Sequence, residues 1–336
     1  QPRASAAVAL GLSAPDDAAV LQFPGAPLLL QTVDFFRAMV GDPYLFGRIA
    51  ANHALGDIYA MGGVPETALA IATLPPARPV IVEHDLFHML KGGIDVLEAA
   101  GAVLVGGHSA EGAEMALGFA VTGRPPAGRL LRKGGLEPGQ RLILTKPLGT
   151  GVILAGEARG LAPARVVAGA VAAMLQGAGE AATSLLAHRA AACTDVTGFG
   201  LLGHLLEMLR ASGMEAALDP GAIPVLDGAL ALLEGGVASS LEAANRAALA
   251  ALAAETGAQN GPMAALLIDP QTAGGLLAGL PAECVAPCLA ELKALSYRAA
   301  EIGLVLPLSG PEPRVRLDPH CLDRAREQRA EAAAIS

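Results

Sequence analysis

The sequence predicts a two-domain α/β protein, and three observations lead to this fold class. The chain has 336 residues, enough for two domains of ordinary size. Short apolar runs typical of buried strands alternate with helix patterns over residues 1–124. A segment rich in Pro, Gly, Arg and Lys follows at residues 125–139, and the alternation restarts after it. We therefore expect a second domain at residues 140–310 and a charged tail at residues 311–336.

The composition excludes several classes of protein. A hydrophobic fraction of 53% and a charged fraction of 16% are typical of a globular chain. A net charge of −9 argues against nucleic acid as a partner, and 3% aromatic residues argue against a base-stacking platform. No apolar run reaches the roughly 18 residues of a membrane span, and there is no signal-peptide pattern. Four cysteines without a disulfide framework fit a reducing compartment, so we expect a cytoplasmic protein.

The first strand and helix form the segment around which we expect the site to be built. Residues Leu28–Phe36 are apolar and β-prone, which predicts a buried strand that carries Asp34 near its end. Asp42 is a good N-cap with Pro43 at the first helical position, and Gly62 predicts the end of that helix.

Carboxylates gather at the ends of these elements. On the predicted helix, His53 and Asp57 lie one turn apart on one face, so Asp57 can converge with Asp34. Asp16 and Asp17 lead directly into another short apolar strand. An alternative is that these are surface aspartates and a capped helix. Carboxylates beside apolar strands without nearby Lys or Arg favour a bound cation, so we predict a metal site.

The remaining elements follow the same patterns. In the first domain we expect strands at residues 67–74, 102–105 and 115–122, and a helix at residues 82–100 that Gly101 ends. In the second we expect a helix at residues 164–189, a helix that ends near Gly213, and strands at residues 141–145, 192–196, 264–269, 275–280 and, last, 297–306. The tail is expected to form a loosely attached helix.

Two glycine motifs allow more than one interpretation. Gly106-Gly107-His108-Ser109 follows a strand and has the build of a phosphate-binding turn, although an ordinary tight turn has the same pattern. Gly198–Gly203 matches Gly-x-Gly-x-x-Gly, and Asp219 follows at the distance of a ribose-binding acid, which predicts a dinucleotide-binding oxidoreductase as a rival. Asp195 precedes that motif, where it would repel a pyrophosphate unless a cation intervened. Asp195 is therefore better interpreted as a metal ligand.

Together the strand-end and helix carboxylates form a candidate metal set: Asp17, Asp34, Asp57 and Asp195. Mg²⁺ takes one or two carboxylates and completes its octahedron with water and phosphate oxygens. Four carboxylates therefore imply more than one ion, as when a nucleoside triphosphate is held through its phosphates.

The histidines and cysteines carry less information. His204 lies on an apolar helix and is interpreted as structural, whereas His53 and His108 lie in candidate site motifs and stay open. Cys284 and Cys288 lie one turn apart and could ligate a metal, but without a second ligand pair a core helix is the preferred interpretation.

Eight stretches of this chain resemble the selenophosphate synthetases, or selenide, water dikinases. They run in family order from about Asp16 to Leu277 and read DDAAV, QTVDFF, DPYLFGRIAA, DIYAMGG, GGHS, LTKPLGTGV, TDVTGFGLLGHLLEM and DPQTAGGLL. Other ATP-using enzymes of the same superfamily, such as aminoimidazole ribonucleotide synthetase and thiamine-monophosphate kinase, share only the acidic skeleton.

The resemblance implies a two-domain aminoimidazole ribonucleotide synthetase-like fold and a homodimer formed through the N-terminal sheets. It implies the conversion of ATP, selenide and water to selenophosphate, AMP and phosphate. The Mg²⁺ ligands that it implies are Asp17, Asp34, Asp57 and Asp195. The ATP contacts that it implies are Asp16, Asp34, Asp57, Gly107, His108 and Ser109, and it implies that the partner subunit supplies the last three.

The chain departs from the family pattern at several positions. His53 and Gln176 stand where the family usually has Asn, and Gly56 stands where it usually has Ser. The family's reactive Cys and nearby Lys precede the first acidic motif, but the fifteen residues before Asp16 contain neither. Cys193 is interpreted as structural, and no catalytic residue is assigned.

The residue sequence of the N-terminal motifs resembles that of a branch of the family in which this domain follows a flavin-dependent NADH-dehydrogenase-like domain. We therefore expect the missing pair upstream of Gln1, and this chain alone to make little selenophosphate. The alternative is a nucleotide-binding module without synthetase activity that regulates a fused oxidoreductase.

Overall fold

The computed structural model describes residues 5–126, 129–253 and 260–327 and divides the chain into two compact units. The N-terminal unit comprises residues 1–132 and 172–182, and the C-terminal unit comprises the remainder. The boundary at residues 132 and 133 lies inside the predicted linker.

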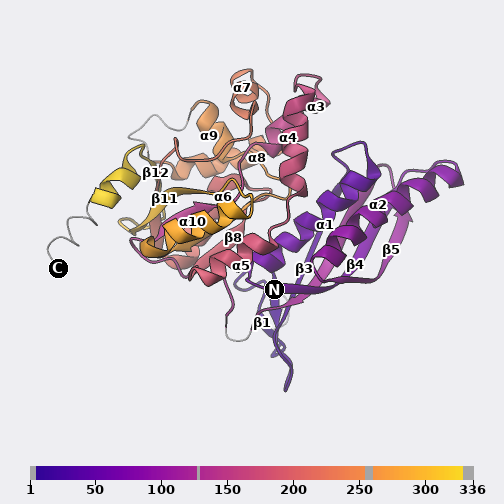
Figure 1. Ribbon diagram of the computed structural model, residues 1–336, viewed down its shortest axis with the longest axis horizontal. Coiled ribbons are helices and arrows are strands. Elements are labelled where there is room, and N and C mark those ends of the chain that lie inside the picture. The colour runs from indigo at the N-terminus through magenta and orange to yellow at the C-terminus, as the bar shows by residue number, and fades with distance from the viewer. Residues whose placement is uncertain (1–4, 127–128, 254–259, 328–336) are drawn as a thin grey trace. The chain divides into compact units, whose positions relative to one another are not determined.

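The N-terminal unit is a six-stranded sheet with two long helices (Figure 1). Its strands occur in the order β1-β2-β3-β6-β4-β5, and β4, α2 and β5 form a parallel β-α-β unit. The elements are β1 Val8–Leu10, β2 Ala19–Leu21, β3 Leu29–Arg37, α1 Pro43–Ala60, β4 Val64–Leu74, α2 Pro79–Ala99, β5 Val103–Glu111 and β6 Ala116–Arg124.

Helix α1 begins and ends where the sequence predicts. The Asp42 side chain accepts hydrogen bonds from the backbone N–H groups of Tyr44 and Leu45, at 2.8 and 3.1 Å, and Pro43 occupies the first turn. Gly62 follows the helix in the left-handed conformation, with φ of 70°. The predicted segment 82–100 is likewise a helix, and α2 extends it at its N-terminal end to Pro79.

Glycines bring α1 and α2 into close contact on one face of the sheet, where Figure 1 shows them side by side. A Cβ on Gly47 of α1 would lie 1.9 Å from the Met89 carbonyl oxygen, and a Cβ on Gly92 of α2 would lie 2.1 Å from the Tyr44 carbonyl oxygen. A side chain at either position would therefore force the two backbones apart. The core beneath the helices includes Phe46, Leu55, Ile58, Met89 and Phe119.

The other face of this sheet is apolar and exposed. Strand β3 was expected to be buried, but its side chains alternate: Leu30 is buried, whereas Val33 and Phe35 are 57% and 47% exposed. Leu69 of β4 and Val103 and Val105 of β5 are also exposed, at 46–59%. β3 therefore carries apolar side chains on both faces. One face packs against helices, and the other contributes to an exposed hydrophobic surface.

The C-terminal unit contains a second six-stranded sheet, in the order β12-β9-β11-β7-β10-β8. The strands are β7 Arg141–Leu144, β8 Ala192–Asp195, β9 Met214–Leu218, β10 Leu276–Leu280, β11 Ala300–Pro307 and β12 Val315–Leu317. The α-helices are α3 Thr150–Ala158, α4 Ala164–Leu175, α5 Gly179–Ala187, α6 Gly200–Ser212, α7 Ala229–Glu234, α8 Glu242–Asn245, α9 Pro262–Leu267 and α10 Val285–Ala294, with 3₁₀ turns at Arg246–Ala251 and Ala282–Cys284. Part of α4 and of α5 belongs to the N-terminal unit.

The predicted helix at residues 164–189 is wrong, because the chain forms two helices, α4 and α5, bent by 58°. The break contains Gly177, which weakens a helix interior. The Asn52 side-chain amide of α1 donates to the Leu175 carbonyl at 3.0 Å and thereby caps the end of α4.

One further element prediction is wrong, and another is right only in part. Residues 264–269 were expected to form a strand, but residues Pro262–Leu267 form α9, because a short apolar run suits either structure and Pro262 stands at the first helical position. The segment from Pro311 was expected to be a loosely attached helix, and its residues 321–327 are indeed helical. The segment is not loosely attached, because it also supplies β12, which pairs in parallel with β9, and because Cys321 and Leu322 are buried. β11 is consequently not the last strand; residues 328–336 lie outside the described residues.

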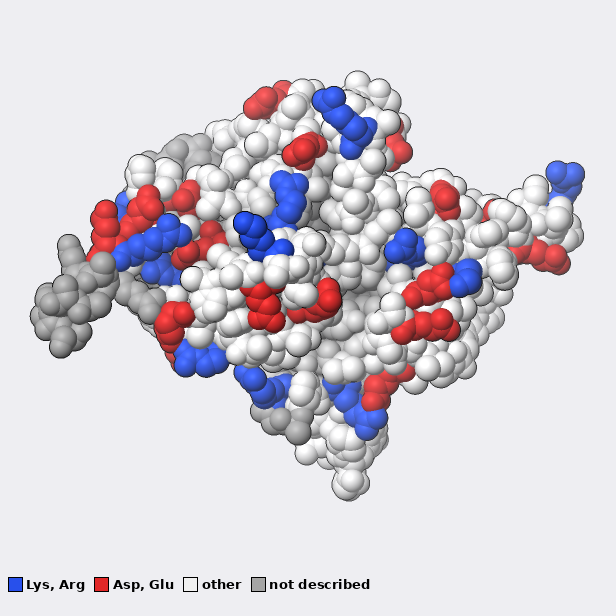
Figure 2. Space-filling model, viewed as in Figure 1, with Lys and Arg blue, Asp and Glu red and all other residues white. Residues whose placement is uncertain are grey.

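No single helix among the described residues is long and apolar enough to cross a membrane; the bent pair α4 and α5 passes only on combined length and composition. On the described part of the face shown in Figure 2, acidic and basic side chains are interspersed rather than gathered into a basic stripe.

Candidate functional site

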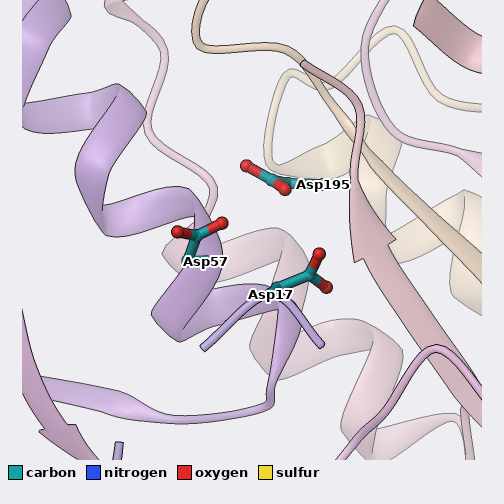
Figure 3. Close-up of side chains that lie close together, drawn as sticks. All are labelled: Asp17, Asp57 and Asp195. Atoms are coloured by element: carbon teal, nitrogen blue, oxygen red, sulfur yellow. The ribbon is translucent and has the colours of Figure 1, made fainter. Parts of the chain in front are cut away.

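Two of the predicted metal ligands meet in the N-terminal unit. Asp17 lies just before β2 and Asp57 lies in the last turns of α1, and their carboxylate oxygens approach within 4.8 Å. Both side chains are half-buried, and Figure 3 shows the Asp57 carboxylate on the side of α1 on which Asp17 lies. Two carboxylates this close repel each other unless a cation or a proton lies between them. Oxygen donors of this kind suit Mg²⁺.

Neighbouring side chains orient this carboxylate pair. The Thr32 hydroxyl of β3 donates a hydrogen bond to Asp57 Oδ2, and the Asp17 backbone N–H donates to Asp16 Oδ1 at 2.9 Å. Asp16 therefore shapes the turn that presents Asp17. Side chains of β3 alternate between the two faces of the sheet, and Thr32 lies on the face that packs against α1, where it can reach Asp57.

Asp34 lies two residues after Thr32, so its side chain points to the same face of β3. Its carboxylate lies close to the imidazole of His53. His53 Nε2 lies 3.8 Å from Asp34 Oδ1, and the His53 ring packs edge-on against Phe36 with ring centroids 4.9 Å apart. Burial raises the pKa of the Asp34 carboxyl above its usual value, and the charge of His53 opposes this shift. The structure therefore places His53 beside a candidate site residue.

The Gly106–Ser109 motif is not a turn. β5 continues through it to Glu111, so the prediction of a phosphate-binding turn is wrong. Gly107 is required because a Cβ there would lie 2.2 Å from the Ala70 carbonyl oxygen of β4. His108 and Ser109 line a cavity of about 340 Å³ between β5 and α2, together with Leu86, Leu90 and Leu104.

This motif lies far from the carboxylate pair within one N-terminal unit. β3, β6 and β4 separate β2 from β5 in the sheet. Four strand spacings amount to about 19 Å. The structure therefore brings Asp17 together with Asp57, and Asp34 together with His53, whereas Gly107, His108 and Ser109 lie on β5 at the edge of the sheet.

In the C-terminal unit, Asp195 ends β8 and is buried, with 5% exposure. Burial lowers the pKa of the Lys146 ammonium to about 7, and the charge of Asp195 opposes this shift. Lys146 Nζ donates to the Ala273 carbonyl at 2.9 Å, where Ala273 has a φ of 46°. Lys146 thus stabilises a turn next to the strand, β10, that pairs with β8.

A buried network closes the N-terminus of α3. Gln271 Oε1 accepts hydrogen bonds from the backbone N–H groups of Gly149 and Thr150, at 2.9 and 3.1 Å, and Asp269 Oδ2 accepts from that of Val152 at 3.1 Å. Burial raises the pKa of Asp269 to about 7, and the hydrogen bonds that the Val152 N–H and the Gln271 side-chain amide donate to its carboxylate oppose the shift. The first-turn donors of α3 are therefore occupied by the protein's own side chains.

Lys146, Asp269 and Gln271 were missed as site-shaping residues. All three lie in the stretches LTKPLGTGV and DPQTAGGLL that carried the resemblance, so their signal was present. Their roles depend on burial and on partners distant in sequence, which no spacing rule reveals.

The topology excludes the dinucleotide-binding interpretation of Gly198–Gly203. A β-α-β dinucleotide fold needs its first two strands adjacent and parallel. Here β8 is an edge strand that pairs antiparallel with β10, and β9, which follows α6, lies near the opposite edge. The glycines shape a loop: Asn245 donates to the Gly198 carbonyl at 2.8 Å, and a Cβ on Gly203 would lie 2.5 Å from the Phe199 side chain.

His204 of α6 holds the loop that follows Asp195. The Thr197 backbone N–H donates to His204 Nε2 at 3.1 Å, so that nitrogen carries a lone pair and the ring proton lies on Nδ1. Nδ1 lies 3.7 Å from Glu207 Oε2, and Glu207 accepts from Lys133 at 2.8 Å. His204 therefore has the structural role that was expected. Its ring accepts the hydrogen bond of Thr197, two residues after Asp195, and so holds that loop in place.

We expect His204→Leu to weaken this loop by about 1–3 kcal/mol, the cost of leaving a buried donor without an acceptor. His204→Gln should largely restore it, because its amide oxygen can lie near the position of Nε2. Hydrogen exchange at the Thr197 amide measures the effect directly. Unchanged exchange in His204→Leu would contradict the assignment.

The cysteines fit structural roles. Cys193 and Cys288 are fully buried, and Cys288 lies 3.9 Å from the Ser184 hydroxyl, which favours the core-helix interpretation of α10.

With the fold and these geometries in view, comparison with known proteins assigns the family. The AIR synthase related protein models match over residues 15–124 for the N-terminal domain and 137–315 for the C-terminal domain. A selenide, water dikinase of Desulfitobacterium hafniense is 42% identical over 301 residues, 89% of this chain and 86% of that protein. One of Nitratidesulfovibrio vulgaris is 38% identical over 321 residues, 95% of this chain and 90% of that protein. The chain belongs to the selenide, water dikinase family of AIR synthase related proteins.

Solved structures agree with the fold of this family member. A thiamine-monophosphate kinase from Stenotrophomonas maltophilia superposes with a TM-score of 0.67 at 19% identity, covering 92% of this chain and 91% of its own. The hydrogenase maturation protein HypE, solved in complex with ATP, gives 0.64 at 18% identity, covering 87% and 80%. The expected two-domain aminoimidazole ribonucleotide synthetase-like α/β fold is confirmed.

Proposed function

We propose, contrary to the expectation drawn from the absent Cys and Lys, that this chain uses ATP, selenide and water to make selenophosphate, with AMP and phosphate as the other products. The observation that carries the proposal is the Asp17–Asp57 carboxylate pair, in a chain of the selenide, water dikinase family. Two ionised groups within 4.8 Å are costly without a cation, and a cation there can bind the phosphates of a nucleotide.

In this proposal Mg²⁺ binds to Asp17 and Asp57, with Asp34 as a further ligand. For Asp195 of the C-terminal unit we propose a role as a Mg²⁺ ligand from the resemblance to the family. When bound, Mg²⁺ neutralises phosphate charge and orients the reacting oxygens. Thr32 orients Asp57 by donating a hydrogen bond to Asp57 Oδ2. Asp16 shapes the turn that holds Asp17, so we assign it a positioning role at the nucleotide site.

We further propose that the chain is a homodimer and that Gly107, His108 and Ser109 contact ATP bound by the partner subunit. Two observations support this. The motif lies on β5, four strands away from β2, the strand that Asp17 precedes. The exposed apolar face formed by Val33, Phe35, Leu69, Val103 and Val105 would be covered by a second copy of the same sheet.

The dimer is tested by charge on that face. Phe35→Asp is expected to give a monomer in analytical ultracentrifugation, because a carboxylate would be buried in an apolar interface. Phe87→Asp is the matched control, since Phe87 is also exposed but lies on α2. A wild-type chain that stays monomeric, or Phe35→Asp that stays dimeric, would contradict the assignment.

Phosphorus NMR with ATP, selenide and Mg²⁺ tests the reaction, and calorimetry of ATP binding with and without Mg²⁺ tests the site. Appearance of the selenophosphate resonance together with AMP supports the full proposal. Mg²⁺-dependent ATP binding without selenophosphate supports the alternative, a nucleotide-binding module. ATP affinity that is equal with and without Mg²⁺ overturns both.

We assign no catalytic thiol in this chain. A thiolate suits the delivery of selenium, but Cys193, Cys288 and Cys321 are buried and Cys284 is half-buried on the C-terminal unit. Cys193→Ser is therefore expected to leave ATP use unchanged in the NMR assay. A loss of activity in that variant, with unfolding unchanged, would show that Cys193 takes part.

A further inference from the structure

The exposed side of helix α2 carries a histidine pair that the proposed reaction does not use. His84 and His88 lie one turn apart, and their ring centroids are 4.4 Å apart. Residues 84–88 read His-Asp-Leu-Phe-His, and two histidines with this spacing on one helix face can ligate one metal ion.

Local contacts orient both rings. His84 Nδ1 lies 3.2 Å from Asp85 Oδ1, so its N–H faces the carboxylate and its Nε2 presents a lone pair. A carboxylate in this position is the usual outer partner of a metal-binding histidine. The His88 ring packs edge-on against Phe87, with centroids 5.3 Å apart and planes at 87°.

The helix itself is fixed beneath the pair. Met89 is fully buried, Gly92 contacts the α1 backbone, and a Cβ on Gly93 would lie 2.5 Å from the Phe119 ring. The spacing of the two imidazoles is therefore held by the core, and the His84 side chain is 63% exposed. Glu83 and Asp85 add negative charge beside the pair, which favours cations.

We propose that His84 and His88 chelate one first-row transition-metal ion of the Zn²⁺, Ni²⁺ or Cu²⁺ class. Imidazole nitrogen suits these ions, whereas Mg²⁺ prefers the oxygen ligands of the carboxylate site. The chain supplies two ligands, and water completes the coordination. The site is independent of the proposed reaction and can be tested without substrate.

The test is calorimetry of the full chain with NiCl₂ and with ZnCl₂ in buffer containing excess Mg²⁺. A Cys284→Ser background removes the half-buried thiol as a competing ligand. One ion should bind per chain. Loss of either histidine, in His84→Ala or His88→Ala, should weaken binding by roughly tenfold or more, and Asp85→Asn by roughly tenfold, the low end of the range for outer partners.

The matched control is His320→Ala, because His320 is exposed on the C-terminal unit. It should bind the metal as the wild-type chain does. Nitrogen couplings from two imidazoles in the Cu²⁺ electron paramagnetic resonance spectrum should fall to one in His84→Ala. Single-histidine variants that bind within about twofold of wild type would overturn the proposal, as would metal binding that survives the double variant.

Discussion

Asp57→Asn is expected to weaken the Mg²⁺-dependent binding of ATP strongly. Asparagine keeps an oxygen that accepts from Thr32, so the local structure survives, but the charge that holds the ion is lost. We expect a loss of roughly a hundredfold, because removing one charged partner from a desolvated contact costs about 2–5 kcal/mol. Calorimetry with Mg-ATP measures it.

The same variant should shift the stability of the ligand-free protein in the opposite direction. Asp17 and Asp57 repel each other within 4.8 Å, so neutralising one of them should raise the melting temperature without Mg²⁺. Asp42→Asn is the matched control, since Asn caps a helix as well as Asp does and Asp42 lies at the start of α1. Unchanged Mg-ATP affinity together with a lower melting temperature would show that Asp57 is a structural residue only.

Gly47→Ala is expected to cause the largest loss of stability in the N-terminal unit. Its Cβ would lie 1.9 Å from the Met89 carbonyl oxygen, and a backbone atom cannot rotate away as a side chain can. Separating α1 from α2 should cost about 3 kcal/mol or more, the upper part of the range for overpacking. Denaturant unfolding followed by circular dichroism measures the change.

Gly169→Ala is the control for this substitution. Gly169 also lies inside a helix, α4, but a Cβ there meets nothing within 4 Å. It should therefore raise the stability by about 0.5–1 kcal/mol, the usual gain of Ala over Gly inside a helix. Equal effects of the two substitutions would mean that α1 and α2 are not held by glycine contacts.

The sequence alone determined the local features that depend on neighbouring residues. The Asp42 cap, the Pro43 start and the Gly62 end of α1 could be predicted because capping involves residues a few positions apart. Most strands could be predicted because their apolar runs are short and bounded by turn residues. The strand-end position of Asp195, and Asp57 on α1, followed from the same patterns.

Only the tertiary structure decided features that depend on residues far apart. Whether the apolar run Leu266–Ile268 forms a strand or a helix could not be settled by periodicity, and α9 packs as a helix. The break between α4 and α5 depends on a cap from Asn52, more than a hundred residues earlier. The Gly-x-Gly-x-x-Gly match failed because strand order, which no local pattern encodes, places β8 at a sheet edge.

The candidate site divides in the same way. Residue types and spacing led to the prediction of Asp16, Asp17, Asp34 and Asp57 as site residues, because carboxylates beside apolar strands need a counter-charge. The sheet order alone revealed that Gly107, His108 and Ser109 lie at the far edge, since strand neighbours are set by long-range pairing. The exposure of Val33 and Phe35 likewise depends on what covers each face of the sheet, which is a property of the whole fold.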